Sequence, residues 1–144
     1  MDFDEIMALV RRHEGTVYHV YFDSRGVPTG GVGHAFHVGS KLSPVVVEKL
    51  FYDDMRDAYD DYNKLLFARD IHGPRKAVIV DMLFNLGLSG FQKFEMMIDA
   101  MIRGDCDDVC REMFDSRWAS QVGDRAEELA MMWYDNKPPD YEPD

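Results

Sequence analysis

Two carboxylic acids and a hydroxyl group near the N-terminus have the types and the spacing that glycoside hydrolysis requires. Eight residues separate Glu14 from Asp23, and five separate Asp23 from Thr29. One carboxyl can protonate the leaving oxygen of a glycosidic bond, while the other activates water or stabilises the developing cation. A neighbouring hydroxyl can hold that water. The pattern therefore predicts a glycosidase site.

The first acid falls at the expected end of an amphipathic helix. Apolar residues recur at helical spacing before it, and Asp2 with Glu5 forms the sequence signature of a capping box. The apolar positions are Phe3, Ile6, Met7 and Val10. We therefore expect a helix that ends near Glu14.

The second acid falls in the expected turn of a β-hairpin. Residues 16–22 alternate β-branched and aromatic side chains with others, as a strand does. Residues 23–26 are of the types that favour turns, and residues 27–37 would form the returning strand. Pro28 and the Gly30-Gly31 pair weaken the returning strand, so we expect it at an edge, or bulged where backbone must approach something closely. Both acids would then lie on one rim of a cleft.

The rest of the chain has mainly helical patterns. Ser43-Pro44 begins a long helix that we expect to end near Phe67. Further helices are expected at residues 74–87, 91–103, 105–114 and 124–134. The predicted fold class is α+β in one 144-residue domain, with an α+β lobe (1–42), a connecting helix (43–67), a helical lobe (68–134) and a disordered acidic tail (135–144). Trp118 is expected in the helical core, together with Met96, Met97, Met101 and Met113.

Composition limits the classes of partner. The formal net charge of -11 repels nucleic-acid phosphate, so we expect no nucleic-acid binding. No apolar run approaches the roughly 18 residues of a membrane span, and no signal peptide precedes the first helix, so we expect no membrane insertion and a cytoplasmic location. Cys106 and Cys110 lie four residues apart in a predicted helix, where a disulfide would be strained, and we expect both to be reduced.

Together these residues resemble the phage-type lysozymes of the T-even endolysin kind, glycoside hydrolase family 24. The resemblance rests on the Glu14, Asp23 and Thr29 spacing, on Thr-x-Gly-x-Gly-His at residues 29–34, and on the segments 46–51, 81–87 and 116–126. It covers residues 6–130 and implies the lysozyme-like α+β fold. The segment between His37 and Ser43 is shorter than in the T-even enzymes, so part of the lobe that borders the cleft should be reduced.

Each candidate residue has an expected role, which comes from its own chemistry or, for inversion and for Arg125, from the resemblance. Glu14 would be the general acid, kept protonated by desolvation in the cleft. Asp23 would be the base on a water held with Thr29, and this arrangement inverts the anomeric centre. Phe84 and Asn85 would bind substrate, with His34 and Arg125 in support. Arg125 would reach towards the catalytic glutamate from the C-terminal lobe.

Plainer readings exist for the same residues. Glu14 could be a surface residue, Asp23 a turn former, Thr29 a strand residue and Phe84 a core residue. His34 lies three residues from His37, but we find no third metal ligand and expect a hydrogen-bonding, structural role.

The expected activity is a muramidase that cleaves the β-1,4 bond between N-acetylmuramic acid and N-acetylglucosamine in peptidoglycan, without metal or cofactor. The protein would be a monomer in the host cytoplasm and would need a holin-like route to the cell wall. Two alternatives remain: a non-catalytic glycan-binding module, which the negative charge favours, and a lytic transglycosylase, in which the glutamate acts alone.

Overall fold

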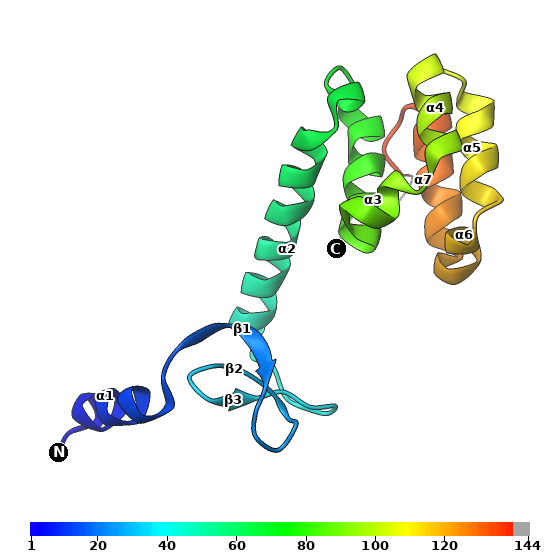
Figure 1. Cartoon of the computed structure of the whole chain (residues 1–144). Helices are drawn as coiled ribbons and strands as arrows, with labels where there is room; N and C mark the ends of the chain where they lie inside the picture. The colour runs from blue at the N-terminus through cyan, green and yellow to red at the C-terminus, as the bar shows by residue number, and fades with distance from the viewer. Residues whose placement is uncertain (140–144) are drawn as a thin grey trace. The chain divides into compact units, whose positions relative to one another are not determined.

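The computed structural model describes residues 1–139 and divides the chain into two compact units. We call Met1–Val46 the sheet unit and the residues from Val47 onward the helical unit. The sheet unit contains α1 (Phe3–Glu14), β1 (Val17–Phe22), β2 (Pro28–Gly31) and β3 (His34–Ala35) (Figure 1). At the boundary α2 begins (Pro44–Lys64), and it is followed by η1 (Leu66–Ala68), α3 (Gly73–Gln92), α4 (Glu95–Arg103), α5 (Cys106–Phe114), α6 (Arg117–Val122) and α7 (Asp124–Asp135).

The first helix begins and ends where the sequence predicts. The Asp2 carboxylate accepts a hydrogen bond from the Glu5 N–H at 2.8 Å, and the Glu5 carboxylate accepts one from the Asp2 N–H at 2.9 Å. At the other end Gly15 has a φ of 74°, which stops the helix, and its N–H donates to the Arg11 carbonyl. Glu14 is therefore the last residue of α1.

The strands form an antiparallel sheet in the order β1-β2-β3. Tyr21 pairs with Thr29, and Thr29 pairs on its other side with Ala35. The returning strand β2 is thus central, and the prediction of an edge position was wrong. Pro28 is tolerated there because it is the first residue of the strand. The β1–β2 register is irregular between Val17 and Tyr21, so the extra residues lie in β1 and not in the returning strand, where the sequence predicted a bulge.

The long helix α2 stops at Lys64, three residues before the predicted end. Leu65 leaves the helix with φ -84° and ψ 98°, and the chain then makes the short 3-10 helix η1. The buried Tyr62 hydroxyl stabilises this exit, because it lies 2.7 Å from the Ala68 carbonyl and 2.6 Å from the Ile71 carbonyl. The hydroxyl thus ties the last turn of α2 to carbonyls six and nine residues further along the chain.

Two helix boundaries in the second half differ from the prediction. Gly87 breaks the helical geometry with φ 72° and ψ 168°, as predicted, but helix resumes after it and α3 continues to Gln92. Phe91 consequently belongs to α3, and α4 begins only at Glu95. The short helix α6 had no periodic signal of its own; Ser116 caps it by accepting the Ala119 N–H.

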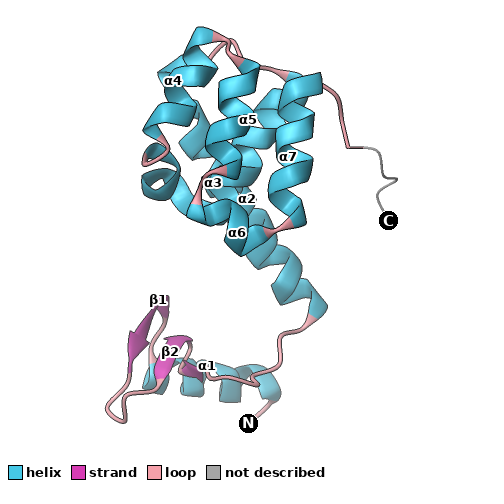
Figure 2. Cartoon of the chain, turned by 90° about the vertical axis from the view of Figure 1, so that its right-hand side faces the viewer, coloured by secondary structure: helices cyan, strands magenta, loops and turns pink. Residues whose placement is uncertain are grey.

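Figure 2 shows the helices that make up the helical unit, and this unit contains the apolar core. Within it α5 packs against α4 and α7, while α3 and α6 also pack against α7. Trp118, Met97, Met101 and Met113 are buried as predicted, whereas Met96 is 64% exposed and was wrongly placed in the core. The inner face of α4 is formed by Met97, Ala100 and Met101 at helical spacing, and Met96 falls outside it.

The two cysteines are free thiols, as expected. The Cys106 sulfur accepts a hydrogen bond from the Arg75 guanidinium, and the Cys110 thiol donates one to the Ala130 carbonyl. Burial raises the pKa of Cys110. Among residues 1–139, no helix combines the length and apolar character needed to cross a membrane. Of the tail predicted to be disordered, residues 140–144 lie outside the described residues, whereas Asp135 is the last residue of α7 and Asn136 caps that helix.

Candidate active site

A tight turn between β1 and β2 presents the Asp23 side chain. The Asp23 N–H donates to the Val27 carbonyl at 3.0 Å, and the Gly26 N–H donates to the Asp23 carbonyl at 3.0 Å. Gly26 has a φ of 77°, a conformation that side chains rarely adopt. The turn residues predicted from sequence thus fix the backbone on both sides of the acid.

Backbone hydrogen bonds hold the Asp23 carboxylate within this turn. Its Oδ1 accepts the N–H of Val27 at 2.9 Å and the N–H of Arg25 at 2.8 Å. These two bonds lower the pKa of Asp23, that from Val27 most; burial opposes them slightly, and the Arg25 charge adds a smaller lowering. Asp23 is therefore held ionised, as an acceptor of protons requires.

Thr29 is also held by the backbone of Val27. Its hydroxyl donates to the Val27 carbonyl at 2.8 Å, and the side chain is buried, with 5% of the residue exposed. Val27 therefore gives its N–H to Asp23 and its carbonyl to Thr29. Because the Thr29 proton is used in this bond, the lone pairs of its oxygen are left to accept a hydrogen bond from water.

Glu14 lies against the turn that joins β2 to β3. A Cβ built on Gly33 in this turn would stand 2.8 Å from the Glu14 Oε2 and 3.2 Å from its Cδ. The Glu14 side chain is exposed, so burial within the sheet unit does not supply the desolvation expected from sequence. The strand β2 links the candidate residues, since Thr29 lies in it and Gly33 follows its last residue by two positions.

His34 begins β3, where it pairs with Gly30. Its ring is exposed and meets the Phe36 ring edge to face, with centroids 4.7 Å apart. Within the described part of the chain, no three His, Cys, Asp or Glu side chains stand close enough together to hold a metal ion. The ring contact gives His34 a packing role in this structure.

The other candidates lie in the helical unit. Phe84 and Arg125 line an apolar cavity of about 310 Å³ together with Phe51, Met55, Tyr59 and Val80. Phe84 is 38% exposed, and its ring lies 5.8 Å from that of Phe51. Phe84 therefore combines partial packing with an accessible aromatic face, which fits either of its two predicted roles.

Arg125 is paired within its own unit. Its Nε donates to the Asp81 carboxylate at 2.8 Å, and Nη2 lies 3.5 Å from the Asp81 carbonyl. The sequence resemblance instead directs this arginine towards Glu14. Asp81 begins segment 81–87, one of those that carry the resemblance. A lone acidic residue in a helical pattern does not indicate a partner 44 residues away along the chain.

Asn85 is fixed by the core of the helical unit. Its side-chain oxygen accepts a hydrogen bond from the Trp118 indole N–H at 2.8 Å. The amide NH₂ group is therefore directed away from Trp118 and keeps two donors. Val27 and Gly33 are the residues of the site that sequence reasoning missed: Val27 acts through its backbone, and Gly33 was noted only as part of a motif.

Comparison with known proteins agrees with this architecture. The phage lysozyme family matches residues 11–131. The chain is also 26% identical over 152 aligned positions to the pre-baseplate central spike protein Gp5 of Enterobacteria phage T4. That alignment covers 86% of this chain but 26% of Gp5, so the chain spans about a quarter of the length of this relative. From the family match and the lysozyme-like α+β fold together, we conclude that the chain belongs to the phage lysozyme family.

Proposed function

We propose that this protein is a muramidase that hydrolyses the β-1,4 bond between N-acetylmuramic acid and N-acetylglucosamine in peptidoglycan. The observation that carries the proposal is that the backbone of Val27 binds both side chains: its N–H donates to Asp23, and its carbonyl accepts the Thr29 hydroxyl. An ionised carboxylate and an oxygen with free lone pairs then lie on one short segment. Together they suit the binding of a single water molecule.

In the proposed reaction, this water is the nucleophile. It donates one hydrogen bond to the Thr29 oxygen and the other to the Asp23 carboxylate, which takes up its proton during attack. Glu14 protonates the leaving glycosidic oxygen. Attack by water on the face opposite the leaving group inverts the anomeric centre, which requires about 6.5–9.5 Å between the two carboxyl groups.

The low pKa of Asp23 supports this division of roles. A group that must accept a proton has to be ionised before the reaction, and the backbone donors of Val27 and Arg25 keep Asp23 in that form. Glu14 receives no such pair of backbone hydrogen bonds from its own turn: the Gly15 N–H donates to Arg11 instead.

In the helical unit, we propose Phe84 and Asn85 as substrate contacts. The exposed part of the Phe84 ring offers a flat apolar face to a sugar, and the Asn85 NH₂ group can donate to an N-acetyl carbonyl. Arg125 would support this surface through its ion pair with Asp81. The proposed chemistry needs neither metal nor cofactor.

Two biological settings fit this activity. One is a monomeric endolysin that stays in the host cytoplasm until a holin-like route releases it to the cell wall. The other is a wall-cleaving module of a phage particle, and the similarity to a central spike protein favours this second setting. Western blotting of purified phage particles would separate them, because an endolysin would be absent from the particle and a spike module would be retained.

The test of the activity is release of soluble fragments from purified Gram-negative peptidoglycan, comparing wild type with Glu14→Gln. The substitution keeps the shape of the side chain but removes its acidic proton, so we expect a loss of about 10²–10⁴-fold at unchanged folding. An active Glu14→Gln variant would mean that another residue is the acid.

The products distinguish the remaining alternatives. Hydrolysis adds one water to each cleaved bond, whereas a lytic transglycosylase forms a 1,6-anhydro product that is lighter by one water. Mass spectrometry of the fragments therefore decides between these two reactions. An inactive wild type that still sediments with peptidoglycan would support a non-catalytic binding module.

A further inference from the structure

Gly33 occupies the point at which the β2–β3 turn meets the Glu14 carboxyl. Its φ is 65°, in the region that favours glycine. A Cβ at this position would lie 2.8 Å from Glu14 Oε2, 3.2 Å from Cδ and 3.5 Å from Cγ. The end of the Glu14 side chain therefore fills the space that any side chain at position 33 would need.

We propose that Gly33 is a positioning residue for the general acid: the absence of its side chain sets where the Glu14 carboxyl stands. This inference rests on the proposed role of Glu14 in glycoside hydrolysis. Gly33 touches no reacting atom itself and acts only through Glu14.

The contact would be relieved by movement of Glu14 rather than of the turn. The turn is held by the pairing of Thr29 with Ala35 and of Gly30 with His34 on either side of it. Glu14, in contrast, is an exposed side chain at the end of α1 with three rotatable bonds. A Cβ at position 33 therefore displaces the carboxyl and leaves the fold in place. A displacement near 1 Å is enough to cost about 100-fold in rate.

Gly31 provides a matched control in the same hairpin. Its φ is 60°, close to that of Gly33, but a Cβ built there meets no atom within 4 Å. Alanine at either position bears a similar backbone cost, because both residues have the left-handed conformation. Only alanine at position 33 would disturb Glu14.

The experiment compares Gly33→Ala with Gly31→Ala for thermal stability, kcat and KM on soluble peptidoglycan strands. We expect the two variants to lose similar amounts of thermal stability. We expect kcat to fall about 100-fold in Gly33→Ala and less than about threefold in Gly31→Ala, with KM unchanged in both, since the carboxyl acts on the transition state. Equal kcat values in the two variants would overturn the inference.

A double substitution tests the physical contact itself. Glu14→Asp shortens the acid by one methylene and withdraws it from position 33. In that background, Gly33→Ala should cause a much smaller further loss of kcat than it does in the wild type. A loss of the same size in both backgrounds would show that Gly33 acts without Glu14.

An NMR measurement, which does not depend on enzymatic activity, tests this inference separately from the proposed function. The ¹³C carboxyl resonance of Glu14 should move in Gly33→Ala and stay in place in Gly31→Ala. A resonance that moves alike in both variants overturns the positioning role, whatever the activity. If the wild type proves inactive on peptidoglycan while the resonance moves only in Gly33→Ala, the proposed function fails and the structural contact stands.

Discussion

At the scale of single residues, the backbone of Val27 holds two of the candidate catalytic side chains. Val27 donates its N–H to Asp23 and accepts the Thr29 hydroxyl on its carbonyl. Neither bond involves the Val27 side chain, so the identity of this residue matters less than its backbone. The pKa of Asp23 and the orientation of Thr29 thus both depend on the backbone of one residue.

This dependence predicts the effect of proline at position 27. Val27→Pro keeps the carbonyl that Thr29 uses but removes the largest cause of the lowered pKa of Asp23. The pKa should rise towards its ordinary value, and the acidic limb of kcat/KM should move to higher pH. The variant should also be less stable than the wild type at neutral pH, and the difference should shrink as the pH falls towards the lowered pKa of Asp23 in the wild type, where the stabilisation from its ionised form is lost.

Arg25→Gln is the matched comparison. It keeps the backbone N–H of residue 25 and removes only the nearby charge, which is the smallest of the lowering causes. Its shift should therefore be smaller than that of Val27→Pro. A ¹³C NMR titration of the Asp23 carboxyl measures both, and equal shifts in the two variants would assign the low pKa to the Arg25 charge instead.

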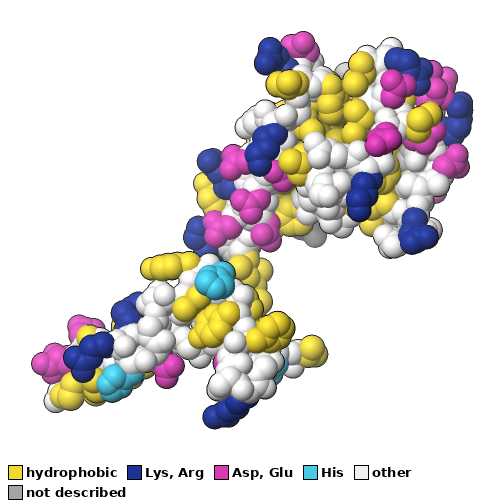
Figure 3. Space-filling view, in the orientation of Figure 1, with side chains coloured by type: hydrophobic (Ala, Val, Ile, Leu, Met, Phe, Trp, Pro, Cys, Tyr) yellow, Lys and Arg dark blue, Asp and Glu magenta, His cyan; other side chains and the backbone are white. Residues whose placement is uncertain are grey.

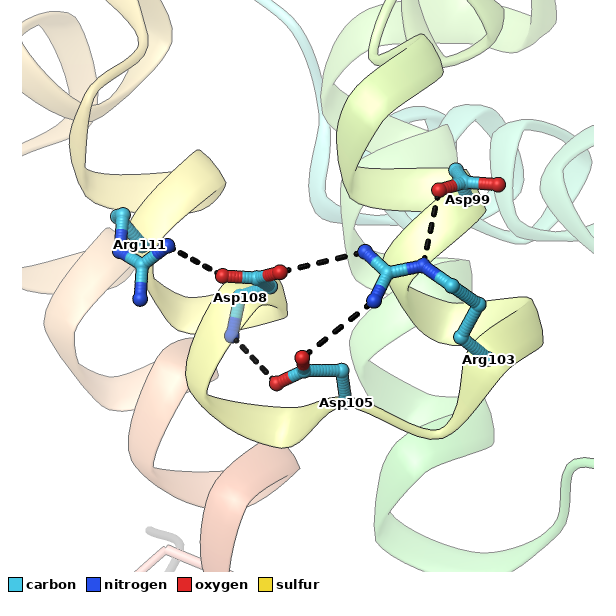
Figure 4. A network of polar contacts seen from close by, with 5 residues as sticks. All are labelled: Asp99, Arg103, Asp105, Asp108 and Arg111. Atoms are coloured by element: carbon cyan, nitrogen blue, oxygen red, sulfur yellow. Dashed lines mark hydrogen bonds and ion pairs between the residues drawn. The ribbon is translucent and has the colours of Figure 1, made fainter.

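At the scale of elements, side chains at the helix ends connect neighbouring segments. In Figure 4 the Arg103 guanidinium, at the end of α4, binds the carboxylates of Asp99, Asp105 and Asp108. Arg111 extends the network through Asp108. Asp105 also caps α5 by accepting the Asp108 N–H, and this bond is the main cause of its lowered pKa. The network fixes the α4–α5 connection, although exposed ion pairs of this kind add little stability.

The buried Tyr62 hydroxyl is a stronger element-scale anchor. Tyr62→Phe leaves the Ala68 and Ile71 carbonyls without this donor, and we expect it to lower the free energy of unfolding by about 1–2 kcal/mol. Tyr59→Phe, at an exposed position of the same helix, should change it by less than about 0.5 kcal/mol. Urea denaturation measures both. Equal effects would show that the hydroxyl does not anchor the end of α2.

At the scale of the whole molecule, charge and core are unevenly distributed between the two units. The sheet unit has five acidic and four basic residues and four of the five histidines, whereas the sequence from Val47 onward has 22 acidic and 12 basic residues. Figure 3 shows carboxylates along α2 and on the helical unit. Among residues 1–139, the buried apolar side chains all lie between Ala58 and Trp133. The net charge of -11 is therefore not a property of the unit that holds Glu14, Asp23 and Thr29.

This distribution predicts how salt affects activity on the anionic cell wall. Between about 10 and about 150 mM salt the Debye length falls from about 30 to about 8 Å, which screens repulsion from the helical unit. Activity on peptidoglycan should therefore rise over this range. The triple variant Asp54→Asn, Asp57→Asn, Asp60→Asn on α2 should be more active at low salt and gain less from added salt. Falling activity throughout the range would contradict the argument.

The sequence by itself determined the local features of this protein. The capping box and apolar spacing gave the correct α1, and turn chemistry at residues 23–26 placed Asp23, because these signals act between residues close in the chain. The spacing of Glu14, Asp23 and Thr29, the glycines after it and three segments of the second half together led to the correct family.

Only the tertiary structure decided which groups meet. The Arg125–Asp81 pair and the Asn85–Trp118 bond join residues 44 and 33 positions apart, and the Tyr62 hydroxyl ties the end of α2 to carbonyls across a turn. The central place of β2 and the contact between Glu14 and Gly33 are of the same kind. Such contacts depend on how complete elements pack, and periodicity within one segment contains no information about its neighbour in space.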